Sequence, residues 1–449
     1  MKRNLGIFGL VFVAALFWAL FFARPACAQI IIRDAEIEDY MTEWFTPVFQ
    51  AAGMDPEQVK IILVQDGKVN AFVAGGANIF FFTGLLEKTE SPGEVIGVMA
   101  HELGHISGGH LIRARKEMEN ASYESILGTI IGIGAAIASG NSAAAPTIGT
   151  ASASMAERRY LSTARTYESS ADQFALTTLE TAKLNPSGFL SFMEKLSGEE
   201  LLPSSRQSEY VRSHPLTHDR ISSIEAGIRR STYVKTPLPL AWAEQHARMK
   251  AKLLGFINPA QVVWVYDDRD KSVAATSARA IAAYRQNHVQ EALNLADILV
   301  QKEPDNPYFQ ELKGQMLLDF GRVKEALPYY EKAVSLKPKS GLIRTALAHA
   351  QIETAGQDTA RLEKAVSHLK IALESEPRSG KIHRLLATAY GRMGNDAAAR
   401  LHLAEEALLQ RKMSYAKNQA EIALKGLKQG TPDWLRAKDI LNFIAQGKT

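Results

Sequence analysis

Two histidines separated by one helical turn carry the strongest chemical signal in the sequence. His101 and His105 enclose Glu102 in the run His101-Glu102-Leu103-Gly104-His105. On a helix, residues four apart point within about 40° of each other, so both imidazoles can share one ion. Glu102 lies about 100° from His101, where it can reach a bound water without displacing a histidine. The pattern predicts one zinc ion per chain, with Glu102 as the general base that activates water for attack on a peptide carbonyl.

A catalytic zinc ion of this kind needs a third protein ligand. Glu168 and Asp172 lie four residues apart in residues 163–184, which are predicted to form a long helix. Their carboxylates therefore project from one face, and the apolar residues around them indicate that this face is packed. We expect Glu168 to bind the metal and Asp172 to hydrogen-bond a ligand histidine. The other residues considered for the metal are His110, His214 and His218.

The helix that carries His101 has a clear beginning. Ser91 can cap its N-terminus, and Pro92 suits the first helical position. Apolar residues keep helical spacing into the histidine region, and we expect the helix to continue to about residue 115. His110 is nine residues from His101 and would face the opposite side of such a helix. It is therefore predicted to be a structural or surface histidine.

Short strand-like runs precede this helix. They are residues 60–65, 70–76 and 79–83, and the second run ends in a pair of glycines. A few short strands mixed with helices predict an α+β domain that is mostly helical and has one small sheet. We assign this zincin-type metallopeptidase domain to residues 29–272.

The composition of the sequence changes near residue 236. Residues 236–272 begin with a proline-containing stretch and are interpreted as a linker or docking segment. A helix is expected near residues 242–254, and the run Val262–Tyr266 has the composition of a strand.

From about residue 276 onwards the sequence is nearly all helical and repeats itself. Pro304 and Pro338 close similar phrases 34 residues apart, and a third copy closes 39 residues later at Pro377. Small residues recur where paired helices would cross, namely Ala292, Ala326 and Ala365. This period is typical of tetratricopeptide repeats. We assign residues 273–449 to an all-α solenoid of three repeats, a fourth near 381–410 and capping helices after 413, with the five extra residues of the third copy in its inter-helix turn.

The first 28 residues have the pattern of a secretory signal peptide. Lys2 and Arg3 precede an apolar stretch, and small residues at 26–28 offer a cleavage site after Ala28. An uncleaved membrane anchor is the alternative. Cys27, the only cysteine, lies in this segment, so the processed chain has no thiol for a disulfide, a nucleophile or a metal. A second apolar run, residues 126–139, is too short to span a bilayer. It predicts either a buried hairpin, or a flap or patch that contacts a membrane or an unfolded client.

Composition indicates a folded protein and argues against nucleic-acid binding. Hydrophobic residues make up 46% of the chain and charged residues 22%. Removal of Lys2, Arg3 and Arg24 with the signal peptide lowers the formal charge from +4 to +1. A chain of such small net charge lacks the basic surface that nucleic-acid binding requires.

The motifs together resemble those of gluzincin metallopeptidases of the HtpX and CAAX-prenyl-protease type. The resemblance consists of the His-Glu-x-x-His run followed by Glu168-x-x-x-Asp172 on a later helix. It extends to Asn70-Ala71-Phe72, to Thr83-Gly-Leu-Leu and to the run from Ser213 to Arg220. It is specific within residues 70–220 and generic in the repeats, which occur in many unrelated proteins.

The resemblance implies an exported, periplasmic zinc endopeptidase. It implies protein substrates among misassembled outer-membrane proteins, and repeats that recruit the β-barrel assembly machinery or its clients. The strand with Asn70, Ala71 and Phe72 would hold an extended substrate by strand addition. His214 would lie near the zinc, either as a fourth ligand that keeps the enzyme latent or as a catalytic donor to the oxyanion, with His218 as a competitor. Arg220 would support the loop or the surroundings of Asp172.

A different class of function fits the second half of the chain better. A concave helical solenoid binds peptides or partner proteins and performs no chemistry. The alternative is therefore a tetratricopeptide chaperone or adaptor for outer-membrane protein assembly with a latent protease domain. Glu102 discriminates between the two functions, because a purely structural zinc site needs no base beside a water.

Overall fold

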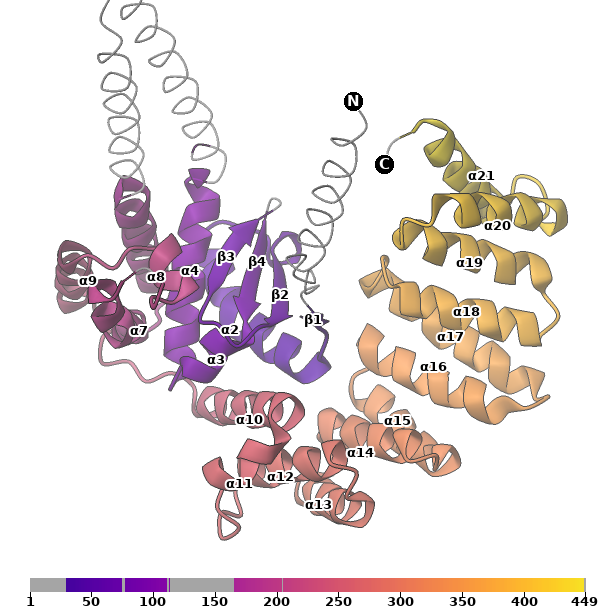
Figure 1. Ribbon diagram of the computed structural model, residues 1–449, viewed down its shortest axis with the longest axis horizontal. Coiled ribbons are helices and arrows are strands. Elements are labelled where there is room, and N and C mark those ends of the chain that lie inside the picture. Colours follow the sequence, from indigo (N-terminus) through magenta and orange to yellow (C-terminus); the bar gives the residue numbers. More distant parts are fainter. Residues whose placement is uncertain (1–29, 75–76, 111–112, 114–164, 204, 448–449) are drawn as a thin grey trace, which may run out of the picture.

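The computed structural model describes residues 30–74, 77–110, 113, 165–203 and 205–447. The predicted signal peptide and the apolar run 126–139 lie outside these residues. An N-terminal unit of helices around one sheet is followed by a curved array of helix pairs (Figure 1). This arrangement confirms the predicted fold class, in which a mostly helical α+β domain precedes an all-α solenoid.

The sheet has four strands in the spatial order β1-β2-β4-β3. Strands β2 and β4 are parallel, whereas β1 pairs with β2 and β3 pairs with β4 in antiparallel fashion. The three strand-like runs of the sequence form β2, β3 and β4, and β3 lies at one edge of the sheet. The strands are β1 (Ile30–Ile32), β2 (Lys60–Gln65), β3 (Ala71–Ala74) and β4 (Asn78–Phe82).

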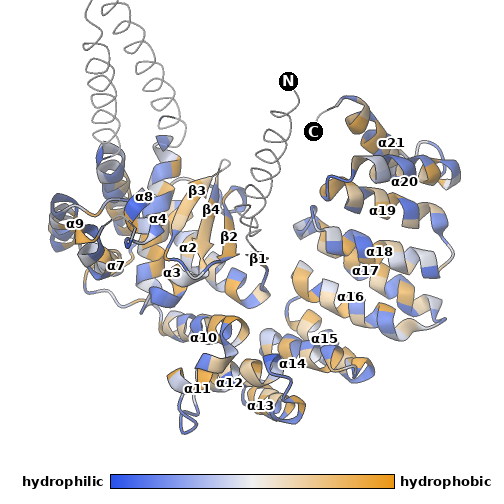
Figure 2. Ribbon diagram, in the orientation of Figure 1, coloured by the Kyte–Doolittle hydropathy of each residue, from blue (hydrophilic) through white to orange (hydrophobic). Residues whose placement is uncertain are grey.

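Two long helices cover the sheet and fix the position of the histidines. Helix α2 (Ala35–Ala51) packs on β4 through Phe45, whose ring centroid lies 5.7 Å from that of Phe81. Helix α4 (Pro92–Ser107) follows the short α3 (Thr83–Lys88) and contacts β3, β4 and α2. The strands are largely hydrophobic, whereas the helices around them carry both hydrophobic and hydrophilic residues (Figure 2). Burial of this apolar face is the main force that holds α4 in place.

Helix α4 begins as predicted but ends earlier. The Ser91 hydroxyl accepts a hydrogen bond from the Glu94 amide at 3.3 Å, and Pro92 occupies the first helical position. Helix α4 ends at Ser107 and a turn at Gly108–Gly109 follows, with residues 110 and 113 again helical, so the expectation of one unbroken helix to about residue 115 is wrong. Gly109 has φ +60°, a left-handed conformation that favours glycine and breaks a right-handed helix.

A second helix crosses α4 at its histidines. Residues 165–181 are helical, and Gly104 of α4 faces Ala171 of this helix. A Cβ at position 104 would lie 2.8 Å from the Ala171 Cα, so only glycine permits this close approach. The crossing brings Glu168 within reach of His101. The unit is completed by three-residue and four-residue 3-10 turns at Pro56–Gln58 and Gly198–Leu201, and by α7 (Ser187–Ser197), α8 (Glu209–Ser213) and α9 (His218–Arg230).

The segment between the two halves of the chain, residues 236–272, contains helices and turns but no strand. Helix α10 (Leu240–Ile257) packs against α2 and against the first repeat helix, and it is followed by a 3-10 turn at Pro259–Gln261. The run Val262–Tyr266, predicted as a strand, forms the short α11 (Val262–Val265) instead. Its neighbours are helices α10 and α12, which offer no strand edge, so local hydrogen bonds such as Tyr266 N–H to Val262 O at 2.9 Å are formed.

Five consecutive helix pairs form the repeat array. The predicted small residues Ala292, Ala326 and Ala365 are fully buried at the helix crossings. The five extra residues of the third copy lengthen its two helices, because its inter-helix turn, 356–358, is as short as the preceding one, 320–322. Their predicted place in the turn is therefore wrong. The helices are α12 (Val273–Arg285), α13 (Val289–Lys302), α14 (Pro307–Asp319), α15 (Val323–Leu336), α16 (Gly341–Ala355), α17 (Thr359–Ser375), α18 (Gly380–Arg392), α19 (Asp396–Leu409), α20 (Met413–Gly426) and α21 (Pro432–Ala445).

A buried set of charges joins α2, α10 and the first repeats, and we call it the junction network. Arg248 of α10 contacts Glu36 of α2 and Glu303, while Lys252 lies 2.8 Å from Asp34 and 3.0 Å from Glu36. Each carboxylate of the network thus faces the positive charge of Arg248 or Lys252. No helix in the described part of the chain has the length and hydrophobicity needed to cross a membrane.

Candidate metal centre

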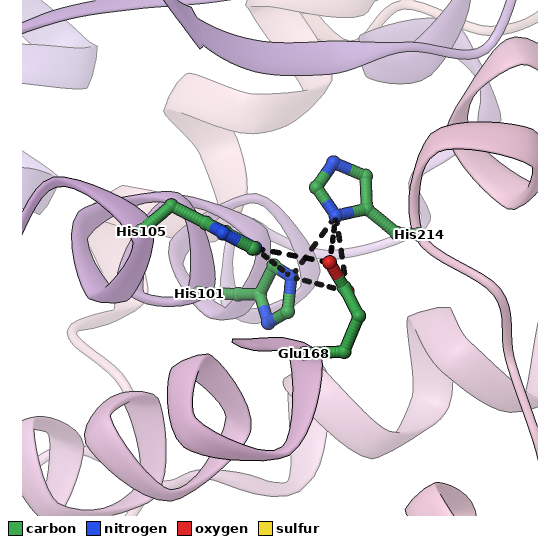
Figure 3. Close-up of side chains that lie close together, drawn as sticks. All are labelled: His101, His105, Glu168 and His214. Carbon is green, nitrogen blue, oxygen red and sulfur yellow. Dashed lines mark hydrogen bonds and ion pairs between the residues drawn. The ribbon is translucent and has the colours of Figure 1, made fainter. Parts of the chain in front are cut away.

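Four side chains from three separate segments converge on one point, and we call them the ligand cluster (Figure 3). His101 and His105 project from α4, Glu168 from the helix at 165–181, and His214 from the end of α8. Their nearest nitrogen and oxygen atoms all lie within 4.8 Å of one another. Among the residues that the structure describes, this is the one group of at least three histidine, cysteine or acidic side chains that could hold a metal ion.

Five of the six spacings among these four side chains are close to those expected around a tetrahedral zinc ion. Bonds of about 2.0–2.1 Å to zinc place tetrahedral ligand atoms about 3.3–3.4 Å apart. His101 Nε2 lies 3.1 Å from His105 Nε2, 3.3 Å from Glu168 Oε2 and 3.4 Å from His214 Nδ1. Glu168 also lies 3.4 Å from His105 Nε2 through Oε1 and 3.1 Å from His214 Nδ1 through Oε2. The donor atoms are imidazole nitrogens and a carboxylate oxygen, which zinc accepts.

Burial and charge act on these groups in opposite directions. Burial disfavours charge on His101, but the carboxylates of Asp172 and Glu168 outweigh it and raise the pKa of His101 to about 9. Burial, aided by His101, lowers the pKa of His105 to about 2. Burial also opposes charge on Glu168, but His214 and His101 hold the pKa of this carboxyl well below its usual range. The cluster therefore contains a carboxylate in its charged form, as metal binding requires.

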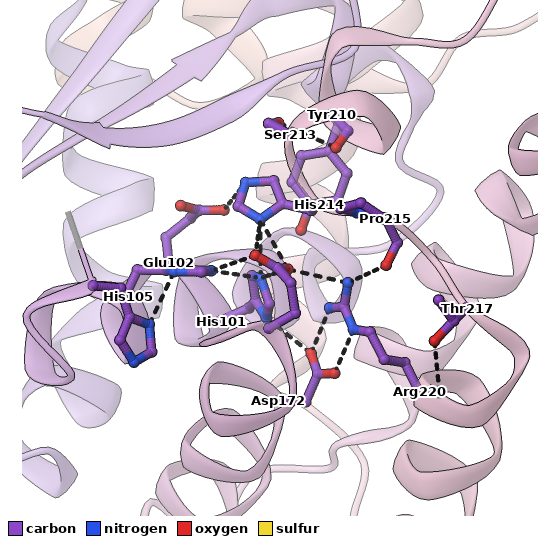
Figure 4. A network of polar contacts seen from close by, with 12 residues as sticks. His101, Glu102, His105, Asp172, Tyr210, Ser213, His214, Pro215, Thr217 and Arg220 are labelled. Carbon is purple, nitrogen blue, oxygen red and sulfur yellow. Dashed lines mark hydrogen bonds and ion pairs between the residues drawn. The ribbon is translucent and has the colours of Figure 1, made fainter. Parts of the chain in front are cut away.

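Asp172 and Arg220 form a buried layer behind the cluster (Figure 4). Asp172 Oδ1 lies 2.9 Å from His101 Nδ1, the ring nitrogen that points away from the cluster. Arg220 donates from Nε and Nη2 to both Asp172 oxygens, at 2.7 and 2.8 Å. Its Nη1 donates to the Pro215 carbonyl at 2.7 Å and lies 3.0 Å from Glu168 Oε2. The sequence left open whether Arg220 supports the loop after His214 or the surroundings of Asp172. In the structure Arg220 contacts both.

Glu102 lies on α4 beside the cluster and is almost fully buried. Its Oε1 atom lies 3.4 Å from His214 Nε2, so this histidine faces Glu168 with one nitrogen and Glu102 with the other. Burial raises the pKa of Glu102, although the charges of His214 and His101 oppose this shift. The ring of Tyr210 packs against His214 at a centroid distance of 4.7 Å.

The edge strand β3 lies next to α4, the helix that carries His101 and His105 (Figure 1). Ala71 is buried in the core, and the ring of Phe72 stacks on Phe80 of β4 with centroids 4.9 Å apart. Asn70 precedes the strand and donates to Glu209 of α8 at 3.3 Å. The three residues assigned from the sequence to a substrate strand thus sit at the sheet edge, beside the segment that carries His214.

His110 lies where the sequence did not place it. Its Nδ1 atom is 3.1 Å from Nδ1 of His105, its ring stacks on Tyr167 at a centroid distance of 4.6 Å, and it is buried. The prediction that it faces away from the site is wrong, because it assumed one continuous helix. The adjacent pair Gly108–Gly109 was the available signal for a turn. His218, by contrast, is exposed at the first position of α9 and lies outside the ligand cluster.

Comparison with known families identifies the class of the site. Residues 33–228 match peptidase family M48, and residues 277–341 match a tetratricopeptide repeat. Residues 33–228 are thus similar to the M48 peptidase family, and the matched tetratricopeptide repeat follows them in the chain.

Individual proteins are similar to parts of the chain. The chain is 24% identical over 331 residues to the beta-barrel assembly-enhancing protease of Escherichia coli (strain K12), covering 72% of this chain and 66% of that protein. It is 28% identical over 172 residues to metalloprotease LoiP of the same strain, covering 38% and 62%. A solved structure of MamA is 22% identical, with a TM-score of 0.32, over 38% of this chain and 97% of that one. The chain thus spans slightly less than two thirds of the length of these curated relatives.

Proposed function

We propose that this protein is a periplasmic zinc metalloendopeptidase that hydrolyses misassembled or misfolded outer-membrane proteins. The observation that carries the proposal is the convergence of four ligand atoms, all within 4.8 Å of one another, with the Glu102 carboxylate beside them. The similarity to the M48 peptidase family supports the reaction class. The similarity to a beta-barrel assembly-enhancing protease supports outer-membrane protein assembly as the context and the periplasm as the compartment.

Each residue of the centre then has a chemical role. His101, His105 and Glu168 are the metal ligands, and Glu102 is the general base. Zinc, when bound, supplies a Lewis acid that lowers the pKa of water and polarises a peptide carbonyl. The raised pKa of Glu102 suits its carboxylate to accept the proton of the attacking water and to pass it to the leaving amine. Asp172 orients His101 from behind, and Arg220 holds Asp172 in place.

His214 sets whether the centre is open. A catalytic zinc site keeps its fourth position for water or substrate, whereas His214 Nδ1 lies 3.4 Å from His101 Nε2 and 3.1 Å from Glu168 Oε2, close enough to be a fourth ligand. We therefore favour a latent state in which His214 is the fourth ligand and must move before catalysis. Its loop is tied to Arg220 through the Pro215 carbonyl, so displacement of this loop would open the site. In the open state the same imidazole could donate to the oxyanion.

Strand β3 supplies the substrate-binding surface in this proposal. An edge strand has unpaired backbone groups on one side, and an extended peptide can add to it as a further strand. Asn70, Ala71 and Phe72 would border such a peptide beside α4. The repeats would recruit the β-barrel assembly machinery or its clients. A contact with the membrane surface through residues 126–139 is part of the same proposal but lies outside the described residues.

The test separates hydrolysis from metal binding. The Glu102→Gln variant should keep close to one zinc per chain, measured by atomic emission, and should lose about 10²–10⁴-fold of its casein-cleaving activity, since general-base catalysis contributes this much. Undiminished cleavage by this variant would exclude the assigned base. A protein that binds zinc but does not cleave even when His214 is replaced by alanine would favour the chaperone or adaptor alternative.

Two further measurements sharpen the proposal. The His214→Ala variant should cleave faster than the parent if His214 keeps the centre closed, and slower if it assists the transition state. Equal rates would remove His214 from both roles. The Glu102→Gln protein can also be used to capture clients from envelope extracts, and mass spectrometry should find outer-membrane β-barrel proteins or their assembly machinery among them.

A further inference from the structure

We propose that His110 is a positioning residue that fixes the ring of the metal ligand His105. This inference rests on the proposed zinc centre and adds a residue to it. His105 turns its Nε2 toward the ligand cluster, 3.1 Å from His101 Nε2, and its Nδ1 toward His110 Nδ1, also at 3.1 Å. A histidine ligand that binds through one nitrogen carries its proton on the other, and the partner of that proton fixes the ring.

The turn after α4 is built to deliver this contact. Gly109, at φ +60°, interrupts the regular helix, and the ring of His110 after it lies against His105. A Cβ at position 108 would lie 2.1 Å from His110 Nε2, so Gly108 leaves the room that this ring needs. The ring of His110 lies nearly parallel to that of Tyr167, at 15°. Tyr167 immediately precedes Glu168, so one stack links the end of α4 to the segment that supplies the third ligand.

The contact sets the tautomers of both rings. With Nε2 of His105 facing the metal position, its Nδ1–H donates to the lone pair of His110 Nδ1, and His110 carries its own proton on Nε2. His101 has the equivalent support from Asp172, a carboxylate. A neutral imidazole behind His105 instead adds no charge. The two charges of a zinc ion and the charge of Arg220 are then balanced by Glu102, Glu168 and Asp172, which is a favourable state for a buried site.

Two variants separate the hydrogen bond from the stacking. His110→Phe keeps a ring to stack on Tyr167 but has no acceptor for His105, whereas His110→Gln keeps an acceptor and loses the ring. Zinc affinity of the full-length chain is measured by chelator competition, with His218→Gln as the control for loss of an exposed imidazole. The expected result is a dissociation constant raised about tenfold or more in His110→Phe and within about threefold of the parent in His110→Gln and the control.

The opposite pattern, with tight binding by His110→Phe and weak binding by His110→Gln, would overturn the proposal and leave a packing role. A direct measurement covers the case in which His110→Phe does not fold. In the zinc-loaded parent with ¹⁵N-labelled histidine, a coupling across the Nδ1–H···Nδ1 hydrogen bond should join the His105 and His110 rings, and its absence would also overturn the proposal. If the parent binds no zinc, the proposed function itself fails.

Discussion

The protein contains two buried sets of ionisable side chains, and they are organised on opposite principles. In the junction network, cations alternate with carboxylates, so Glu36 lies between Arg248 and Lys252. Burial opposes charge on Glu36, but these two cations lower its pKa. In the ligand cluster, three imidazoles and a carboxylate direct lone pairs at a common point. The charges of the first set pair with one another, and the second would be completed by a metal cation in the proposed function.

The difference separates structural charge from functional charge. A network that pairs opposite signs stabilises contacts between helices, and loss of one member leaves an unpaired buried charge. A cluster of converging acceptors gains from an added ion, and loss of one member weakens binding of that ion. Substitutions in the ligand cluster should therefore change zinc affinity, and substitutions in the junction network should change the unfolding free energy.

The largest effect is expected at Glu168. The Glu168→Ala variant removes a ligand atom, so its zinc affinity should fall by more than the roughly 100-fold that loss of an outer partner can cause, and casein cleavage should be lost with it. Chelator competition on the purified protein measures this directly. The urea midpoint of the metal-free form should change little by comparison. A variant that retains one tightly bound zinc would show that Glu168 is not a ligand.

A substitution in the junction network should change the unfolding free energy instead. Glu36→Ala leaves Arg248 and Lys252 buried without their shared partner, which should cost about 3–5 kcal/mol of unfolding free energy while zinc affinity stays unchanged. Urea denaturation gives the value. The control is Glu225→Ala, which breaks an exposed pair with Arg229 and should cost less than about 0.5 kcal/mol. Equal costs at the two sites would contradict the structural role of the network.

A smaller effect is expected behind the ligands. Asp172→Asn keeps the shape of the side chain but removes the charge that faces His101 and Arg220. Loss of such an outer partner typically weakens metal binding about 10–100-fold. Zinc competition, with the exposed Asp219→Asn as control, measures the change. Parent-like affinity in Asp172→Asn would mean that the carboxylate serves only to anchor Arg220.

The smallest effect concerns a histidine pair in the repeats. His383 and His402 face each other through Nδ1 atoms 3.1 Å apart, and burial lowers their pKa values to about 4 and about 3. Unfolded histidine titrates near 6.5. The unfolded chain therefore takes up these protons first, and the contribution of the neutral pair is fully present above pH 6.5 and declines as the pH falls toward 4. Unfolding free energy should fall by about 1 kcal/mol between pH 7 and 6.

Urea denaturation of the parent and of the double variant His383→Gln/His402→Gln checks this expectation. The double variant should lose that part of the pH dependence. Identical pH profiles would show that the pair does not contribute. His383 and His402 are not part of a group of three or more side chains that could hold a metal ion, unlike the ligand cluster. Their titration is therefore expected to affect stability alone.

The parts of the site that follow from spacing along one helix could be predicted. His101, Glu102 and His105 on α4, and Glu168 with Asp172 on the next helix, needed only the helical period. The place of His214 came from resemblance, because spacing in sequence says nothing about which distant loop returns to the metal. In the fold, strands β2 to β4 and the repeat helices followed from their hydrophobic patterns.

The errors occurred where tertiary context or a turn overrides local preference. His110 was misplaced because two glycines end α4 before it, and one missed turn reverses the face on which a residue lies. Val262–Val265 has β-branched residues but no strand to pair with, and it became a helical turn. The face of a regular helix or strand on which a residue lies can thus be predicted from sequence. The exact end of that element is harder to predict, and it decides which residues its flanking side chains contact.

If β3 binds substrate as proposed, its place at the rim of the sheet has a consequence for selectivity. Hydrogen bonds along such a rim are made with main-chain amides and carbonyls, which every polypeptide presents alike. Discrimination among proteins then comes from whether a stretch of chain is extended and unpaired when it arrives. A β-barrel strand that has not yet found its neighbour meets this condition, and the same strand after closure of its barrel does not.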